Sequence, residues 1–336
     1  VERMRGLYGP LLNAAASGVA CAGFCFLNRG GWVECLAVLV AAFIGQAVRR
    51  QMLVRRYQHF FTWLVCGVAA SGVYMSIVGL LEATGAVGGN HEGGVISAIL
   101  FLIPGFPMVT AMLDLVRQDF SSALSRAAYV LMVMASAGVA VWTVTFMFDW
   151  QVEATSTAVP TGWVLHVLRC LCSFVAAYGF SMLFNAGAKA STLAAVVGAL
   201  ANTGRLVLID EFHVPWQLAV GLAAVTIGVL AQLFVSRASL SRVALSVPAV
   251  VIMIPGVPFY RAISALNTLS VDKLGVDVGE AATNLAEVFF VITAIGVGLA
   301  LARIITDHNW RHDVATSGRI TLPRTHVEAV EQPLED

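Results

Sequence analysis

Charged residues are scarce in this sequence. Asp, Glu, Lys and Arg together make up 12% of the 336 residues, whereas apolar residues make up 58% and the mean hydropathy is +0.82. Soluble domains typically contain about 25% charged residues. Several apolar stretches approach or exceed the ~20 residues that cross a bilayer as a helix. The composition therefore excludes a large soluble domain and predicts an all-α polytopic membrane protein that has the lipid bilayer as its surroundings.

The sequence also lacks the motifs of common enzyme and metal sites. It contains no HExxH zinc motif, no Walker phosphate loop and no serine–histidine arrangement of known form. The six cysteines lie in apolar runs without metal-ligand neighbours, which is typical of small packing residues. His308 and His312 are four residues apart, but no third ligand accompanies them. We therefore expect no enzyme activity, metal or other cofactor, and no nucleic-acid partner.

The apolar runs predict ten transmembrane helices. Residues 1–150 form a first five-helix repeat, residues 151–306 a second one, and residues 307–336 a polar cytoplasmic tail. The predicted spans are Pro10–Leu27, Trp32–Val48, Phe60–Leu81, Gly94–Leu115, Ser125–Phe148, Trp163–Leu183, Ala190–Ile209, Pro215–Val235, Ala244–Leu266 and Ala281–Ile305.

The basic residues predict how these spans are oriented. Placing the N-terminus in the cytoplasm puts most of the 20 Lys and Arg residues on the cytoplasmic side. The loops Glu82–Gly93 and Asp149–Gly162, which then lie outside, contain no Lys or Arg. Cytoplasmic loops carry an excess of basic residues in membrane proteins. We therefore expect both termini to be cytoplasmic.

One short stretch occurs twice. FLIPGFPMVTAMLDL covers residues 101–115 and IMIPGVPFYRAISAL covers residues 252–266, with their PGxP segments 151 residues apart (255 − 104). Each copy lies inside a predicted span, the fourth and the ninth. Proline lacks an N–H, so each stretch should break its helix and free the carbonyls of Leu100, Ile103, Val251 and Ile254. A kink in a packed helix is the alternative to a binding site, but two matched breaks favour a site.

The position of the repeat predicts an inverted topology. Each half contains five spans, an odd number, so the second half must insert upside down relative to the first. Inverted repeats with broken helices near the membrane midplane are typical of secondary transporters. The fold prediction is thus ten transmembrane helices in two inverted-topology repeats, with helices 4 and 9 broken at PGxP.

The breaks predict the chemistry of the substrate. A new half-helix starts after each break, and its N–H groups and positive dipole end favour a carboxylate. A small carboxylate-bearing solute is therefore expected, and the residues do not separate an amino acid from a dicarboxylate. The candidate substrate-binding residues are Pro104, Gly105, Pro107, Thr110, Pro255, Gly256, Pro258, Tyr260, Arg261, Asn202 and Arg205.

Ionisable residues within spans are further candidates because burying them in a membrane is costly. Glu287 is the candidate for proton coupling, with an interfacial acid as the alternative. Arg261 is expected to hold a carboxylate or to pair with Glu287. Asp114 and Arg117, three residues apart, predict a local ion pair or a cytoplasmic gate. Glu34 is expected to be interfacial.

The sequence resembles the threonine/serine exporter family. The resemblance rests on PGFPMVTAMLDLVRQDFSSALSR, on FLNRGGWVECLAVLVAAFIGQAVRRQ before it, and on IPGVPFYRAI in the second half. It covers about Leu11 to Thr306. The family's two halves occur fused, as here, or as separate subunits. First halves usually begin with a soluble region, whereas this sequence begins almost at its first predicted span, which starts at Pro10.

The resemblance implies a function. Fused members resemble exporters of threonine and serine that use the proton-motive force, and the two-subunit members are linked to succinate export. We therefore expect a proton-driven antiporter of small polar carboxylates in a bacterial inner membrane, with protons and substrate as partners. A dicarboxylate exporter and a passive channel are the alternatives. A homo-oligomer is compatible with the small residues of the third span.

Overall fold

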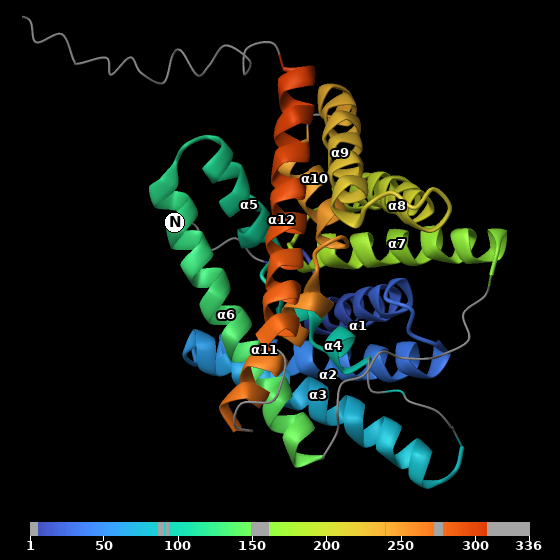
Figure 1. The fold of residues 1–336 in the computed structure, drawn as a ribbon, viewed down its shortest axis with the longest axis vertical. Coiled ribbons are helices and arrows are strands. Elements are labelled where there is room, and N and C mark those ends of the chain that lie inside the picture. Colours follow the sequence, from blue (N-terminus) through green and yellow to red (C-terminus); the bar gives the residue numbers. More distant parts are fainter. Residues whose placement is uncertain are drawn as a thin grey trace, which may run out of the picture.

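Helices are the only regular elements in the described part of the chain (Figure 1). The computed structural model describes residues 6–86, 91, 94–148, 161–238, 240–271 and 278–307. The expected tail at 307–336, with His308 and His312, lies almost wholly outside these ranges, as does most of the expected boundary between the halves at 149–162.

The first half contains five helices, a short helix and a 3₁₀ turn. In chain order the elements are α1 (Pro10–Leu27), α2 (Trp32–Val54), α3 (His59–Ala83), α4 (Gly94–Ala98), η1 (Leu100–Leu102), α5 (Gly105–Val116) and α6 (Phe120–Met147). The expected fourth span therefore consists of three separate pieces, α4, η1 and α5. Pro104 and Pro107 explain the interruption, since neither can donate to the preceding helical turn.

The second half repeats this order. Its elements are α7 (Trp163–Leu183), α8 (Ala188–Asp210), α9 (Trp216–Ala238), α10 (Arg242–Val251), α11 (Gly256–Val271) and α12 (Val278–Thr306). The expected ninth span is broken between α10 and α11, which are bent by 57° relative to each other. Pro255 and Pro258 stand at this break in the positions that Pro104 and Pro107 hold in the first half.

Eight helices of the described chain are long and apolar enough to span a membrane, or nine if the bent pair α10–α11 counts as one span. The ten expected spans are therefore not confirmed. The difference lies in the fourth span, where α4 has 5 residues, η1 has 3 and α5 has 12. A helix rises about 1.5 Å per residue, so none of these pieces alone crosses the ~30 Å of a bilayer core.

Contacts between helices occur in matched pairs. α1 packs against α2 as α7 packs against α8, and α3 packs against α6 as α9 packs against α12. Contacts across the halves match in the same way, because α5 packs against α12 and α11 against α6. α1 and α7, the first helices of the two halves, pack against each other (Figure 1). The packing is thus repeated, whereas the inverted insertion of the two halves stays a prediction.

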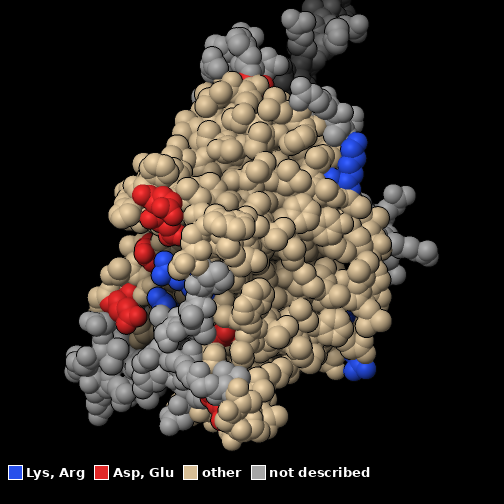
Figure 2. Space-filling view, turned by 90° about the vertical axis from the view of Figure 1, so that its right-hand side faces the viewer, with Lys and Arg blue, Asp and Glu red and all other residues tan. Residues whose placement is uncertain are grey.

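The surface agrees with a membrane environment. Charged side chains form only a few small patches on the face shown in Figure 2, and most of its described area is uncharged. Large apolar side chains are exposed on several helices, among them Leu36 on α2, Phe146 on α6 and Phe289 on α12. Apolar surface of this extent marks an interface with lipid or protein. The chain is therefore an integral membrane protein.

Candidate transport site at the paired helix breaks

The backbone at the first break closes its own hydrogen bonds. The N–H of Ile103 donates to the carbonyl of Leu100 (3.0 Å), and the N–H of Gly105 donates to the carbonyl of Ile103 (2.8 Å). The carbonyl of Leu102 accepts from the indole Nε1 of Trp63 on α3 at 2.9 Å. The expectation that the carbonyls of Leu100 and Ile103 would be free is therefore wrong, because a 3₁₀-type bond to Leu100 and a γ-turn bond to Ile103 replace the missing helical ones.

The second break has the same bonds 151 positions later. The N–H of Ile254 donates to the carbonyl of Val251 (3.2 Å), and the N–H of Gly256 donates to the carbonyl of Ile254 (2.8 Å). Phe259 donates to Pro255 as Met108 donates to Pro104. The expected free carbonyls of Val251 and Ile254 are therefore satisfied locally as well. The repeated sequence thus folds into a repeated backbone conformation.

The two breaks lie against each other. A Cβ added to Gly105 would come within 2.9 Å of Val251 Cγ2 and 3.1 Å of Ile254 Cδ1. A Cβ added to Gly256 would come within 2.9 Å of Ile103 Cδ1 and of Leu100 Cδ2. Val251 and Ile254 are the 151-residue counterparts of Leu100 and Ile103, so the contact is reciprocal. Such self-complementary contacts arise at a two-fold axis.

The half-helices that start at the breaks have few free backbone N–H groups to donate to a ligand. The N–H of Gly105 is used by Ile103, and Pro107 has none, so only Phe106 can offer its N–H among the first three positions of α5. Val257 is the equivalent residue of α11, because Gly256 is bonded to Ile254 and Pro258 lacks an N–H. A carboxylate at these helix ends would therefore need further donors besides the dipole.

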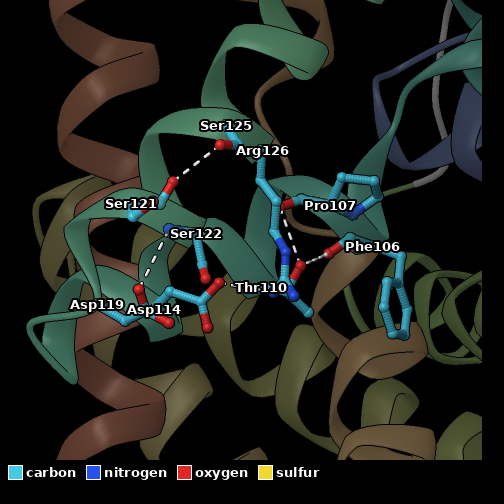
Figure 3. Close-up of polar contacts among 9 residues, drawn as sticks. All are labelled: Phe106, Pro107, Thr110, Asp114, Asp119, Ser121, Ser122, Ser125 and Arg126. Atoms are coloured by element: carbon cyan, nitrogen blue, oxygen red, sulfur yellow. Dashed lines mark hydrogen bonds and ion pairs between the residues drawn. The ribbon is translucent and has the colours of Figure 1, made fainter.

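The two polar side chains that follow the breaks are placed differently. The hydroxyl of Thr110 donates to the carbonyls of Phe106 (2.9 Å) and Pro107 (3.1 Å), within its own helix (Figure 3). Tyr260 is 3% exposed and lies in the core. The hydroxyl of Thr110 is therefore already used by carbonyls of its own helix. Tyr260, in contrast, lies deep enough to line a closed site.

Asn202 and Arg205 form part of a polar network between α7 and α8. The Nε of Arg205 donates to Asn202 Oδ1 (2.9 Å), and Asn202 Nδ2 donates to Ser173 Oγ (2.8 Å). Arg205 is 8% exposed. Arg169 on α7 pairs with Asp210 at the end of α8. These residues form one cluster, which does not include the breaks themselves.

Arg261 and Glu287 stand on the contacting helices α11 and α12, and both are half-buried. The expected ion pair between them is not formed, although both side chains belong to the described chain. Their proposed roles in carboxylate binding and proton coupling therefore rest on position alone.

Asp114 pairs with a different arginine than its spacing suggests. Its carboxylate lies 2.7 Å from Arg126 Nη1 on α6 (Figure 3). Arg117 instead caps the C-terminus of α5. The turn between the helices explains this, since Asp119 caps α6 by accepting from the N–H of Ser122 (3.2 Å) and thereby brings α6 back along α5. Hydrogen bonds from Ser122 hold the pKa of Asp119 below its usual range.

We expect Asp114→Asn to slow transport and to destabilise the protein only slightly. Arg126 is 45% exposed, so the pair should contribute about 1 kcal/mol or less to the free energy of unfolding. Efflux rate and melting temperature measure the two effects. Exchanging the charges in the double variant Asp114→Arg with Arg126→Asp should restore the rate. Arg117→Gln is the comparison: if it reproduced Asp114→Asn and Arg126→Gln did not, the pairing predicted from the spacing would be correct.

A buried acid–imidazole pair was missed by the sequence analysis. Glu34 is fully buried on α2, contrary to the interfacial position expected for it, and its Oε1 lies 2.7 Å from His91 Nδ1. Within the described residues, the buried atoms Glu34 Oε2 and His91 Nε2 have no hydrogen-bond partner. The hydroxyl of Tyr74 donates to the carbonyl of His91. No sequence spacing links these two residues, which are 57 positions apart.

These features together define a polytopic membrane transporter. Residues 1–148 match the family described as "Putative threonine/serine exporter", and residues 169–305 match the one described as "Threonine/Serine exporter, ThrE". The chain therefore belongs to the threonine/serine exporter family, with both family segments in one polypeptide. This is a transporter family, not an enzyme family.

Curated relatives match part of the chain. A protein of Escherichia coli strain K12 named "Probable succinate transporter subunit YjjP" is 29% identical over 120 residues, which are 35% of this chain and 45% of that protein. The protein of the same name from Klebsiella aerogenes is 28% identical over 110 residues, 32% of this chain and 41% of that protein. The aligned part thus spans less than half of each relative. No solved structure matches the chain.

Proposed function

We propose that the protein is a secondary active exporter of small polar solutes that bear a carboxylate, with threonine and serine as the favoured substrates. The observation that carries the proposal is the reciprocal contact between the two broken segments in a chain of the threonine/serine exporter family. Paired breaks at the interface of two repeats are where secondary transporters bind their substrates.

The proposed mechanism is a rocking of one half against the other around the two breaks. The halves would be inverted repeats in a bacterial inner membrane, with both termini cytoplasmic, and the repeated helix contacts support this arrangement. The proposed substrate contacts are those predicted from the sequence: the two PGxP segments, Thr110, Tyr260, Arg261, Asn202 and Arg205. Asp114 and Arg117 are proposed to line the cytoplasmic gate, together with Arg126, which pairs with Asp114.

Proton entry is proposed as the driving force. Two acids are candidates for the carrier: Glu287, predicted from its depth in the last span, and Glu34, whose carboxylate is fully buried beside His91. Ionisable side chains inside a membrane protein are costly and mark functional positions, which is why these two acids are the candidates.

Succinate is the second candidate substrate, because the curated relatives are named as subunits of a succinate transporter. A passive channel is the alternative from a different functional class. A channel would conduct without a proton gradient and with little saturation.

The test is efflux of labelled threonine, serine and succinate from cells that lack their own exporters, with and without a protonophore. We expect the wild-type protein to export threonine and serine and to lose this export when the protonophore is present. Export of succinate alone would change the substrate and keep the mechanism. Flux that ignores the protonophore would indicate a channel, and a lack of flux for all three would contradict the proposal.

A further inference from the structure

An amide side chain followed three residues later by an arginine occurs at equivalent places in the two halves. Gln46 and Arg49 stand three residues apart on α2, and Asn202 and Arg205 stand three residues apart on α8. Both pairs are separated by the same interval (202 − 46 = 156 and 205 − 49 = 156). Both are close to the C-terminal end of their helix. Because α2 and α8 hold equivalent places in the repeated packing, the two arginines are equivalent as well.

The contact between α1 and α7 confirms that the two halves correspond at this interval. A Cβ at Gly23 on α1 would lie 2.9 Å from the carbonyl oxygen of Cys172, and a Cβ at Gly179 on α7 would lie 2.6 Å from that of Ala16. These residues are related by the same interval (179 − 23 = 156 and 172 − 16 = 156). The contact between α1 and α7 is therefore reciprocal, like the contact between the breaks.

The polar networks around the arginines are alike. Arg49 Nη1 donates to Gln46 Oε1 at 3.3 Å, as Arg205 Nε donates to Asn202 Oδ1 at 2.9 Å. Each amide then donates to the preceding helix, Gln46 to Asn13 Oδ1 on α1 at 2.7 Å and Asn202 to Ser173 Oγ on α7 at 2.8 Å. In both halves an amide thus orients an arginine and is itself fixed by a neighbouring helix.

Neither arginine has an acidic partner in the described chain. Arg49 and Arg205 form no ion pair with Asp or Glu within 4.0 Å, whereas Arg169 and Arg126 each do. The Nε of Arg49 is shielded from solvent and forms no hydrogen bond. Arg205 is 8% exposed and Arg49 is half-buried, and without an acidic partner among the described residues both guanidinium groups keep a charge and donors that favour an anion.

Arg49 is also connected to the first break. Its guanidinium carbon lies 4.3 Å from the ring centre of Trp63, a cation–π contact. The indole Nε1 of Trp63 donates to the carbonyl of Leu102 in η1, directly before the PGxP segment. The side chain of Trp63 therefore connects Arg49 directly to the first break.

We propose that Arg49 and Arg205 bind the substrate carboxylate at the two ends of the transport path, one on each side of the membrane. The proposal rests on the proposed export of small carboxylates. In halves that insert upside down, equivalent residues lie at opposite depths. Arg49, at the predicted cytoplasmic end of α2, receives the substrate carboxylate from the cell, and Arg205, at the predicted outer end of α8, holds it before release. Guanidinium groups suit this task because their donors match a carboxylate.

The test measures substrate affinity separately on the two sides. Uptake of labelled threonine and serine into inverted membrane vesicles reports the KM of the cytoplasmic face, and counterflow into right-side-out vesicles reports the KM of the outer face. We expect Arg49→Gln to raise the cytoplasmic KM about tenfold or more and to leave the outer KM nearly unchanged, because a charge-assisted bond is lost on one side. Arg205→Gln should have the opposite effect. Arg49→Lys should restore part of the affinity.

Arg50→Gln is the matched control. Arg50 is the neighbour of Arg49 on α2, but its guanidinium donates to the backbone carbonyls of Tyr8 and Gly9. We expect both KM values of this variant to equal those of the wild type. Elution of each purified variant as a single species on gel filtration shows that it is folded.

Three outcomes would overturn the assignment of the arginines. They are unchanged KM values in both variants, equal changes on the two faces, and a cytoplasmic effect of Arg49→Gln that disappears in vesicles of uncharged lipid. The last would show that Arg49 acts by binding anionic lipid headgroups. Wild-type vesicles that transport none of threonine, serine and succinate would instead contradict the proposed function. The two failures are therefore distinguishable.

Discussion

Leucine at Gly105 or at Gly256 is expected to abolish transport while the protein still inserts into the membrane. A Cβ at Gly105 would already lie 2.9 Å from Val251 Cγ2, and one at Gly256 would lie 2.9 Å from Ile103 Cδ1. Leucine adds three further carbon atoms to this contact. Because overpacked interiors do not deform freely, the two broken segments should be forced apart. Efflux of labelled threonine and serine measures the loss, and the amount of protein in isolated membranes measures insertion.

Gly72→Leu is the matched control for these variants. Gly72 also lies within a helix, but a Cβ at this position would meet no other described atom within 4 Å. We expect its transport to be close to that of the wild type. Gly105→Ala should retain part of the activity, because the contacting atoms are side-chain methyl groups that can shift. Normal efflux in both Gly105→Leu and Gly256→Leu would remove the contact between the breaks from the mechanism.

The breaks could be predicted from the sequence because their cause is local. Proline and glycine act on the backbone of their own segment, so PGxP in two apolar runs was sufficient to place both interruptions. The hydrogen bonds of the break were not predictable in the same way. Whether the carbonyl of Leu102 is free depends on Trp63, 39 residues earlier, which belongs to another helix.

The ion pairs were harder to predict for the same reason. The spacing of Asp114 and Arg117 suggests a pair, but the turn before α6 brings Arg126 closer to the carboxylate. The ten expected spans were also not confirmed. Hydropathy identifies an apolar run from Gly94 to Leu115 but not its division into α4, η1 and α5. Apolar content measures affinity for lipid, whereas the length of a span depends on continuous backbone hydrogen bonds.

The burial of Glu34 was misjudged because hydropathy treats each residue alone. Glu34 is the third residue of α2, a position that normally reaches the headgroups, and a carboxylate near a helix N-terminus is favoured by the dipole. Its burial depends on His91 and on the helices around it. Cys25 on α1, Cys35 on α2 and Tyr74 on α3 are titratable side chains that surround the pair, and they carry no charge when protonated.

Glu34→Gln is expected to uncouple export from the proton gradient. The variant cannot release or accept a proton at this position, but glutamine has nearly the same shape. Exchange of labelled for unlabelled substrate moves no net protons and should continue, whereas export driven by an acid exterior should fall to the level seen with a protonophore. Measuring both in one vesicle preparation separates uncoupling from general loss of function. His91→Gln should have the same effect, because it removes the imidazole that contacts the Glu34 carboxylate.

Glu211 provides the control for this prediction. Its carboxylate also lies near a histidine, 3.4 Å from His166 Nε2, but the side chain is 59% exposed. An exposed acid exchanges protons with water on its own side of the membrane, so Glu211→Gln should keep the full gradient response. Glu287→Gln tests the acid predicted from the sequence. We expect a smaller loss of gradient response, because Glu287 is only half-buried. A normal response in Glu34→Gln together with its loss in Glu287→Gln would assign proton coupling to Glu287, and the buried pair would then be structural.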